Sequence, residues 1–114
     1  MAKLTQTQKE AFRNARWSLA TLETRVFFSR ATGVMLAIIP TPTERKQGQI
    51  VFDITVALCH PNDEFKKKLG LIELYNNYDN GHSTLARIEH NDFKDFAERI
   101  FDYEPFEELE MELN

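Results

Sequence analysis

Ten consecutive residues, 50–59, alternate between large apolar side chains and smaller or polar ones, and this alternation constrains the fold most. Successive side chains of a β-strand point to opposite faces of a sheet, so the pattern predicts a strand whose large side chains share one face. The large residues are Ile50, Phe52, Ile54, Val56 and Leu58, separated by Val51, Asp53, Thr55, Ala57 and Cys59. The chain must therefore build a sheet and cover one of its faces with another layer.

The segment before this strand predicts a helix and then two further strands. From Thr5 to about Arg25, apolar residues recur at steps of three and four, uninterrupted by Gly or Pro. These residues are Phe12, Ala15, Leu19, Leu22 and Val26. The apolar segments 26–28 and 34–39 then flank a loop in which Gly33 can supply a positive φ. An alternative is that the helix continues to Phe28.

Two prolines should end the second of these strands. Pro40 and Pro42 follow Ile39 directly or at close range, and a proline nitrogen cannot donate a hydrogen bond to a neighbouring strand. Residues 43–48 are polar and charged, which is typical of a mobile loop.

The second half of the chain predicts a helix, a short strand and another helix. Residues 61–63 offer capping groups for a helix that ends near residues 79–81, with an inner stripe formed by Phe65, Leu69, Ile72 and Tyr75. A short strand over 83–88 leads to Asn91, the expected N-cap of the last helix. That helix should turn inward Phe93, Phe96, Ala97, Ile100 and Phe101.

Together these elements predict a single α+β domain over residues 1–101, followed by an acidic amphipathic tail over 102–114. The expected order is α-β-β-β-α-β-α. We expect a small, mostly antiparallel sheet of three to four strands, with about three helices covering one of its faces. A crossover through the second helix would also allow strand 83–88 to lie parallel to strand 49–58.

Several features favour a cytoplasmic protein. The longest apolar run, Val34 to Ile39, is far shorter than the roughly 20 residues of a membrane span, so no membrane contact is expected. Residues 1–6 do not resemble the start of a signal peptide. The single cysteine, Cys59, rules out an internal disulfide bond and fits a reducing compartment.

The two ends of the chain carry opposite charge. All 14 Lys and Arg residues precede residue 102, and the net charge of −4 therefore arises from the tail. The tail holds six of the 18 acidic residues: Asp102, Glu104, Glu107, Glu108, Glu110 and Glu112. Residues 1–30 carry six basic side chains against Glu10 and Glu23. Such segregation favours a role in binding rather than in catalysis.

Trp17 and the tail are the leading candidates for contact with a protein partner. On a regular helix Trp17 lies opposite the apolar stripe and one turn from Arg13, and Trp and Arg often dominate interfaces. The alternative is that another element of the same molecule covers the indole. The candidate partner-binding residues are Arg13, Trp17, Phe28, Phe106, Glu107, Glu108, Leu109, Glu110, Glu112 and Leu113.

The tail itself leaves three possibilities open. Phe106, Leu109 and Leu113 would share one face of a short helix, which could dock in a groove on a partner. The tail could also fold back on the basic face of its own domain and compete with an anionic ligand. Finally, its acidic residues could serve only solubility while its apolar residues complete the core.

A second candidate surface is basic and aromatic and would suit single-stranded nucleic acid. Its residues are Arg13, Arg16, Trp17, Arg45, Lys46, Lys66, Lys67 and Lys68. Three consecutive lysines span 200° of a helix and cannot all face one ligand, so a solvated face is the competing interpretation.

The sequence offers no catalytic or metal-binding signature. Cys59 and His60 are adjacent on a strand and point to opposite faces, which is the wrong geometry for a catalytic pair. The three histidines form no zinc motif, and no phosphate-binding glycine loop, nucleophile elbow or HExxH motif is present. We expect no enzyme activity, no metal and no cofactor.

The hypothesis that follows is a small non-enzymatic regulatory or inhibitory protein that binds a protein partner through Trp17 and the tail. The first alternative is a single-stranded nucleic-acid-binding protein whose acidic tail competes with the ligand or recruits partners. The second is a homo-oligomer in which the tail of one subunit meets the basic first helix of another.

Overall fold

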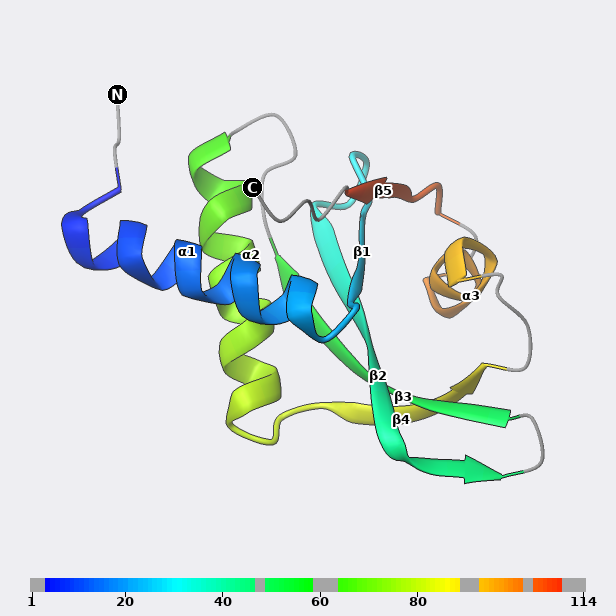
Figure 1. Ribbon diagram of the computed structural model, residues 1–114. Coiled ribbons are helices and arrows are strands. Elements are labelled where there is room, and N and C mark those ends of the chain that lie inside the picture. Colours follow the sequence, from blue (N-terminus) through cyan, green and yellow to red (C-terminus); the bar gives the residue numbers. More distant parts are fainter. Residues whose placement is uncertain (1–3, 47–48, 59–63, 89–92, 102–103, 110–114) are drawn as a thin grey trace.

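The computed structural model describes residues 4–46, 49–58, 64–88, 93–101 and 104–109, with side chains throughout except at 41–50 and 64–66. The helices are α1 (Gln6–Thr21), α2 (Glu64–Asp79) and α3 (Phe93–Ile100). The strands are β1 (Arg25–Phe28), β2 (Val34–Lys46), β3 (Gln49–Leu58), β4 (Thr84–Ile88) and β5 (Glu107–Leu109). They form an antiparallel sheet in the order β4-β3-β2-β1-β5 (Figure 1). The predicted α+β class and element order are confirmed, with five strands instead of three to four.

Helix α1 is fixed at both ends by local interactions. At its start the Gln8 amide donates to the Thr5 hydroxyl at 3.1 Å, and the Thr5 amide donates to the Gln8 side chain at 2.8 Å, which completes a capping box. At its end Glu23 adopts a positive φ of 59° and turns the chain into β1. The alternative that the helix continues to Phe28 is therefore wrong, and the helix ends four residues before Arg25.

The sheet is covered on both faces, whereas the sequence analysis expected helices on one face only. Helices α1 and α2 pack on one face and α3 packs on the other (Figure 1). Phe106 belongs to the cluster on the α3 face. Strand β2 contributes to both clusters: Met35, Ala37 and Ile39 face α1 and α2, while Val34, Leu36 and Ile38 face α3. The continuous apolar run 34–39 is the sequence signal for this arrangement, because a strand buried on both faces need not alternate.

Coverage of the α3 face is incomplete, which corrects the prediction for β3. Phe52 and Ile54 are buried, and the Phe52 ring meets Phe93 of α3 edge-on with centroids 5.1 Å apart. Further along the same face Val56 is 39% exposed and Leu58 is 74% exposed. Alternation correctly predicts which side chains share a face, but it cannot predict how far along the strand a short helix will reach.

Strand β2 continues past both prolines to Lys46, where a loop was predicted. Pro40 pairs with Phe52, and the next registered pair joins Arg45 to Ile50, so the register shifts between them. The irregularity places Pro42 outside the regular ladder, where its missing N–H costs nothing. The full length of β2 was therefore not predicted, because prolines usually end a strand.

Helix α2 presents a different stripe from the predicted one and leads into an antiparallel strand. Among the side chains described, Leu71 and Leu74 are its buried apolar ones, with Tyr75 and Tyr78 packed beside them, and the Phe65 side chain lies outside the description. Near its end the Asn77 side chain donates to the Val56 carbonyl at 3.3 Å, which places the helix end beside the last residues of β3. The chain therefore enters β4 opposite Ile54 and runs back along β3, and the parallel arrangement that a crossover would allow does not occur.

Thr55 provides a test of the packing on the α1/α2 face. It is 1% exposed, and its hydroxyl has no hydrogen-bond partner among the described residues. Because an unpaired buried hydroxyl is costly, Thr55→Val should raise the free energy of unfolding by about 1 kcal/mol, measured by urea denaturation. Thr84→Val, at an exposed position of β4, is the control and should change it by less than about 0.5 kcal/mol. A lower free energy of unfolding in Thr55→Val would contradict the statement that the Thr55 hydroxyl is buried without a hydrogen-bond partner.

Candidate protein-binding surface

One stripe of α1 faces away from the core and carries an exposed indole. Trp17 is 62% exposed, whereas Ala15 and Leu19, two residues away on either side, are buried. The exposed residues that share this stripe are Glu10, Arg13, Asn14, Trp17 and Thr21, which we call the α1 outer face. The prediction that Trp17 faces outward is confirmed, and no described element covers it.

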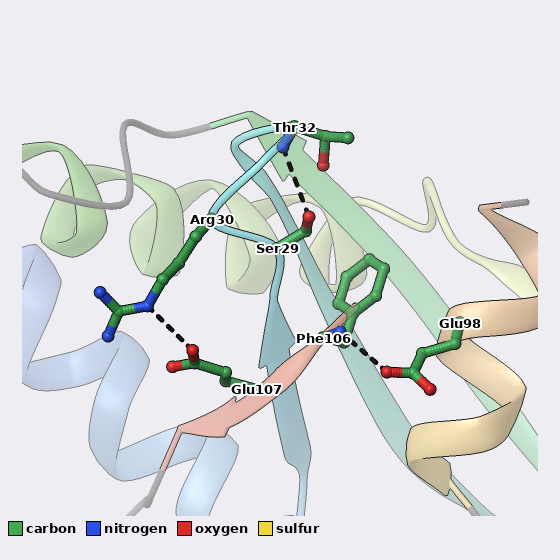
Figure 2. A network of polar contacts seen from close by, with 6 residues as sticks. All are labelled: Ser29, Arg30, Thr32, Glu98, Phe106 and Glu107. Carbon is green, nitrogen blue, oxygen red and sulfur yellow. Dashed lines mark hydrogen bonds and ion pairs between the residues drawn. The ribbon is translucent and has the colours of Figure 1, made fainter. Parts of the chain in front are cut away.

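The described part of the tail folds back onto its own domain. Strand β5 pairs antiparallel with β1, in the register Val26↔Leu109, Phe27↔Glu108 and Phe28↔Glu107. Phe106 is 1% exposed and packs against Phe101 of the α3 region at a centroid distance of 5.5 Å. Its amide donates to the Glu98 carboxylate at 3.0 Å (Figure 2). Phe106 is therefore a core residue here, which corrects its assignment as a surface contact.

Two arginines of β1 and of the turn after it neutralise the two acidic residues of β5. The Arg30 Nε donates to Glu107 at 2.9 Å (Figure 2), and Arg25 donates to both oxygens of the Glu108 carboxylate, one of them at 2.8 Å. The hydrogen bond from Arg25 lowers the pKa of Glu108, and the same contact raises the pKa of Arg25. Of the three possibilities for the tail, residues 104–109 combine two: they meet the basic face and complete the core.

The Arg25 guanidinium is oriented by aromatic rings as well as by Glu108. Its central carbon lies 4.9 Å from the centroid of Phe93 and 5.9 Å from that of Phe27. Stacking on a ring face restricts a long side chain that would otherwise sample many rotamers. The two rings and the Glu108 carboxylate therefore hold the same guanidinium.

The predicted nucleic-acid residues are distributed over α1, α2 and the end of β2. The Lys67 ammonium lies 4.7 Å from the ring of Phe28, and the Lys68 ammonium lies 5.5 Å from the ring of Phe12. Phe28 itself is only 4% exposed, so its assignment as a partner-binding residue is corrected. Arg16 is half-buried on α1.

The remaining candidates lie elsewhere or outside the description. Arg45 and Lys46 are at the tip of the β2–β3 hairpin, across the molecule from α1 (Figure 1). Lys66 belongs to the first turn of α2, and its side chain is not described. Leu109 is half-buried in β5. Glu110, Glu112 and Leu113 lie outside the described residues.

Sequence analysis missed Arg25 and Arg30, which contact the tail, and Glu98, which accepts the Phe106 amide. The charge difference between the first 30 residues and the tail was the available signal, and it indicated attraction without indicating which residues would pair. The glutamate on α3 had no signal, because its role depends on where α3 packs.

Within the described ranges, no three His, Cys, Asp or Glu side chains converge in a way that could hold a metal ion. No helix of that part of the chain combines the length and hydropathy that a membrane span requires. Comparison with protein-family models, with curated proteins and with solved structures found no match.

The contact between Arg25 and Glu108 predicts a pH dependence. Because folding lowers the pKa of Glu108, this contact stabilises the protein above the ordinary pKa of glutamate and is lost as pH falls through the lowered value. Both side chains are about 40% exposed (42% and 39%), so the contribution should not exceed about 1 kcal/mol. In Arg25→Met the pKa of Glu108 should rise toward its ordinary value, followed by carboxyl NMR during a pH titration. Arg30→Met is the control and should leave that pKa unchanged; an equal pKa in wild type and Arg25→Met would contradict the assignment.

Proposed function

We propose that this chain is a small, non-enzymatic regulatory protein that binds a protein partner through the α1 outer face, with Trp17 as the main anchor. The observation that carries this proposal is the 62% exposure of the indole on a helix whose opposite side is anchored by the buried residues Ala15 and Leu19. Tryptophan contributes more binding energy per residue than most side chains when a partner buries it. Because the indole is exposed in the isolated chain, a partner that buries it would gain this binding free energy.

The rigidity of α1 supports this proposal. The capping box at Thr5 and the burial of Ala15 and Leu19 fix the helix against the domain, so Trp17 is presented on a framework that need not order during binding. A side chain held in this way loses less conformational entropy in a complex than one on a loose segment.

The charges around Trp17 favour a protein over a nucleic acid. The α1 outer face contains one cation, Arg13, and one anion, Glu10. Elsewhere in the described part, Arg25 and Arg30 contact carboxylates of the same chain. A nucleic-acid surface usually concentrates several cations along the path of the phosphates.

Trp17→Ala tests the proposal directly. The chain, immobilised at its N-terminus, is used to capture partners from the native host, and the captured protein is purified for calorimetry. We expect Trp17→Ala to weaken its affinity by at least about tenfold, because a hot-spot residue contributes 2 kcal/mol or more. Leu85→Ala, which removes another exposed apolar side chain (55% exposed), is the matched control and should bind as wild type. Equal affinity for wild type and Trp17→Ala would reject the α1 outer face as the contact.

The single tryptophan also reports on binding. Its fluorescence should shift to shorter wavelength when a partner buries the indole, and both variants should unfold at the same urea concentration as wild type within error. A loss of binding accompanied by a loss of stability would indicate a folding defect instead.

Single-stranded nucleic acid is the second candidate, because Arg13 and Trp17 lie one turn apart and are both exposed. The two candidates differ in their salt dependence. Binding to phosphates should weaken steeply between low and physiological salt, whereas burial of Trp17 in a protein interface should respond weakly. A homo-oligomer through the same face would appear as a solution mass that falls in Trp17→Ala.

A further inference from the structure

Strand β1 would be an edge of the sheet if residues 107–109 were not paired with it. β2 occupies one side of β1, and β5 occupies the other with three registered pairs. The β1 side chains are already buried in both core clusters, through Phe27 on one face and Val26 and Phe28 on the other. The domain therefore presents a fixed strand edge to whatever segment lies beside it, and strand addition to such an edge is a common mode of peptide recognition.

Each residue of the docked segment meets a separate feature of the domain. The site accepts the ring of Phe106 beside Phe101, and it binds the Phe106 amide through Glu98. Arg30 binds the carboxylate at position 107 (Figure 2), and Arg25 binds the carboxylate at position 108. The side chain at position 109 packs beside the α1/α2 cluster. The site thus selects an extended segment with an aromatic residue, two carboxylates and an apolar residue in that order.

The contact is small enough to open without unfolding the domain. β5 has three residues, and its ion pairs are largely exposed, with side-chain exposures of 42% and 39% in one pair and 61% and 53% in the other. Exposed ion pairs stabilise little, and the segment has one fully buried side chain, Phe106, to hold it. Short elements held by few buried side chains open locally at low cost.

We propose that the β1 edge, together with Arg25, Arg30, Glu98 and Phe101, is a binding site for an extended acidic peptide of a partner protein, and that residues 106–109 occupy it as a competitor in the same chain. The charges decide the class of peptide, since both arginines already bind carboxylates. A second copy of the chain is a poorer occupant, because exchanging identical segments creates no new contact and still loses translational freedom. The site is separate from the α1 outer face and does not depend on Trp17.

The test uses the full chain and a capped peptide with the sequence of residues 104–109, Glu-Pro-Phe-Glu-Glu-Leu. In wild type the attached segment competes at an effective concentration in the millimolar range, so the peptide should bind weakly. The double variant Glu107→Ala with Glu108→Ala weakens only the competitor, and it should bind the peptide roughly tenfold more tightly in an NMR titration. Chemical-shift changes should be confined to β1, Arg30, the surroundings of Phe101 and the part of the α1/α2 cluster beside position 109.

Charge reversal makes the test specific. A peptide with lysine in place of both carboxylates should not bind the double variant, but it should bind the full chain carrying Arg25→Glu and Arg30→Glu. Equal binding of the acidic and reversed peptides, or no gain in the Glu107→Ala, Glu108→Ala variant, would overturn the proposal. Formation of a dimer in which the segments exchange, detected by light scattering, would assign the site to a second copy of the chain and overturn the proposal as well.

Trp17→Ala should leave the peptide affinity unchanged. The peptide-binding proposal and the proposal for the α1 outer face can therefore fail independently.

Discussion

Strand β1 is paired on both edges and buried on both faces, and the arrangement of the other elements depends on it. Its consecutive residues Phe27 and Phe28 point to opposite faces and belong to different core clusters. Each cluster needs its own cover, which α1 and α2 provide on one face and α3 with Phe106 on the other. The outer edge of β1 needs hydrogen-bond partners, and β5 supplies them from the end of the chain.

The opposite charges at the two ends of the sequence meet in the folded protein. Arg25 and Arg30 come from the basic first part of the chain, and Glu107 and Glu108 come from the acidic tail. A separation by 77 and 83 residues in sequence thus becomes two direct contacts across one strand pair. Two of the six acidic residues of the tail are therefore paired within the molecule, whereas the predicted contacts Arg13 and Trp17 remain exposed.

The sequence predicted the features that depend on local pattern. The period of α1, the alternation of β3 and the outward position of Trp17 all follow from side-chain geometry within one element. The features it missed depend on neighbours that are distant in sequence. Three residues are too few to reveal a strand such as β5, and the exposure of Val56 and Leu58 depends on the position of α3. Pro40 and Pro42 predict a strand end in isolation, but Pro40 still pairs with Phe52 and a register shift within β2, after Pro40, accommodates Pro42.

Exposed apolar side chains are not equally informative about function. Leu58, Leu85 and Ile100 are exposed on three different elements, and isolated aliphatic residues of this kind are common on protein surfaces. Trp17 differs because it is large, lies on a capped helix, and has an arginine one turn away. Helix α1 also leads into β1 through a short turn, so the two proposed surfaces lie on consecutive elements. A partner held at Trp17 would raise the local concentration of any acidic segment that it carries, and this would favour displacement of β5 without requiring high affinity at either surface.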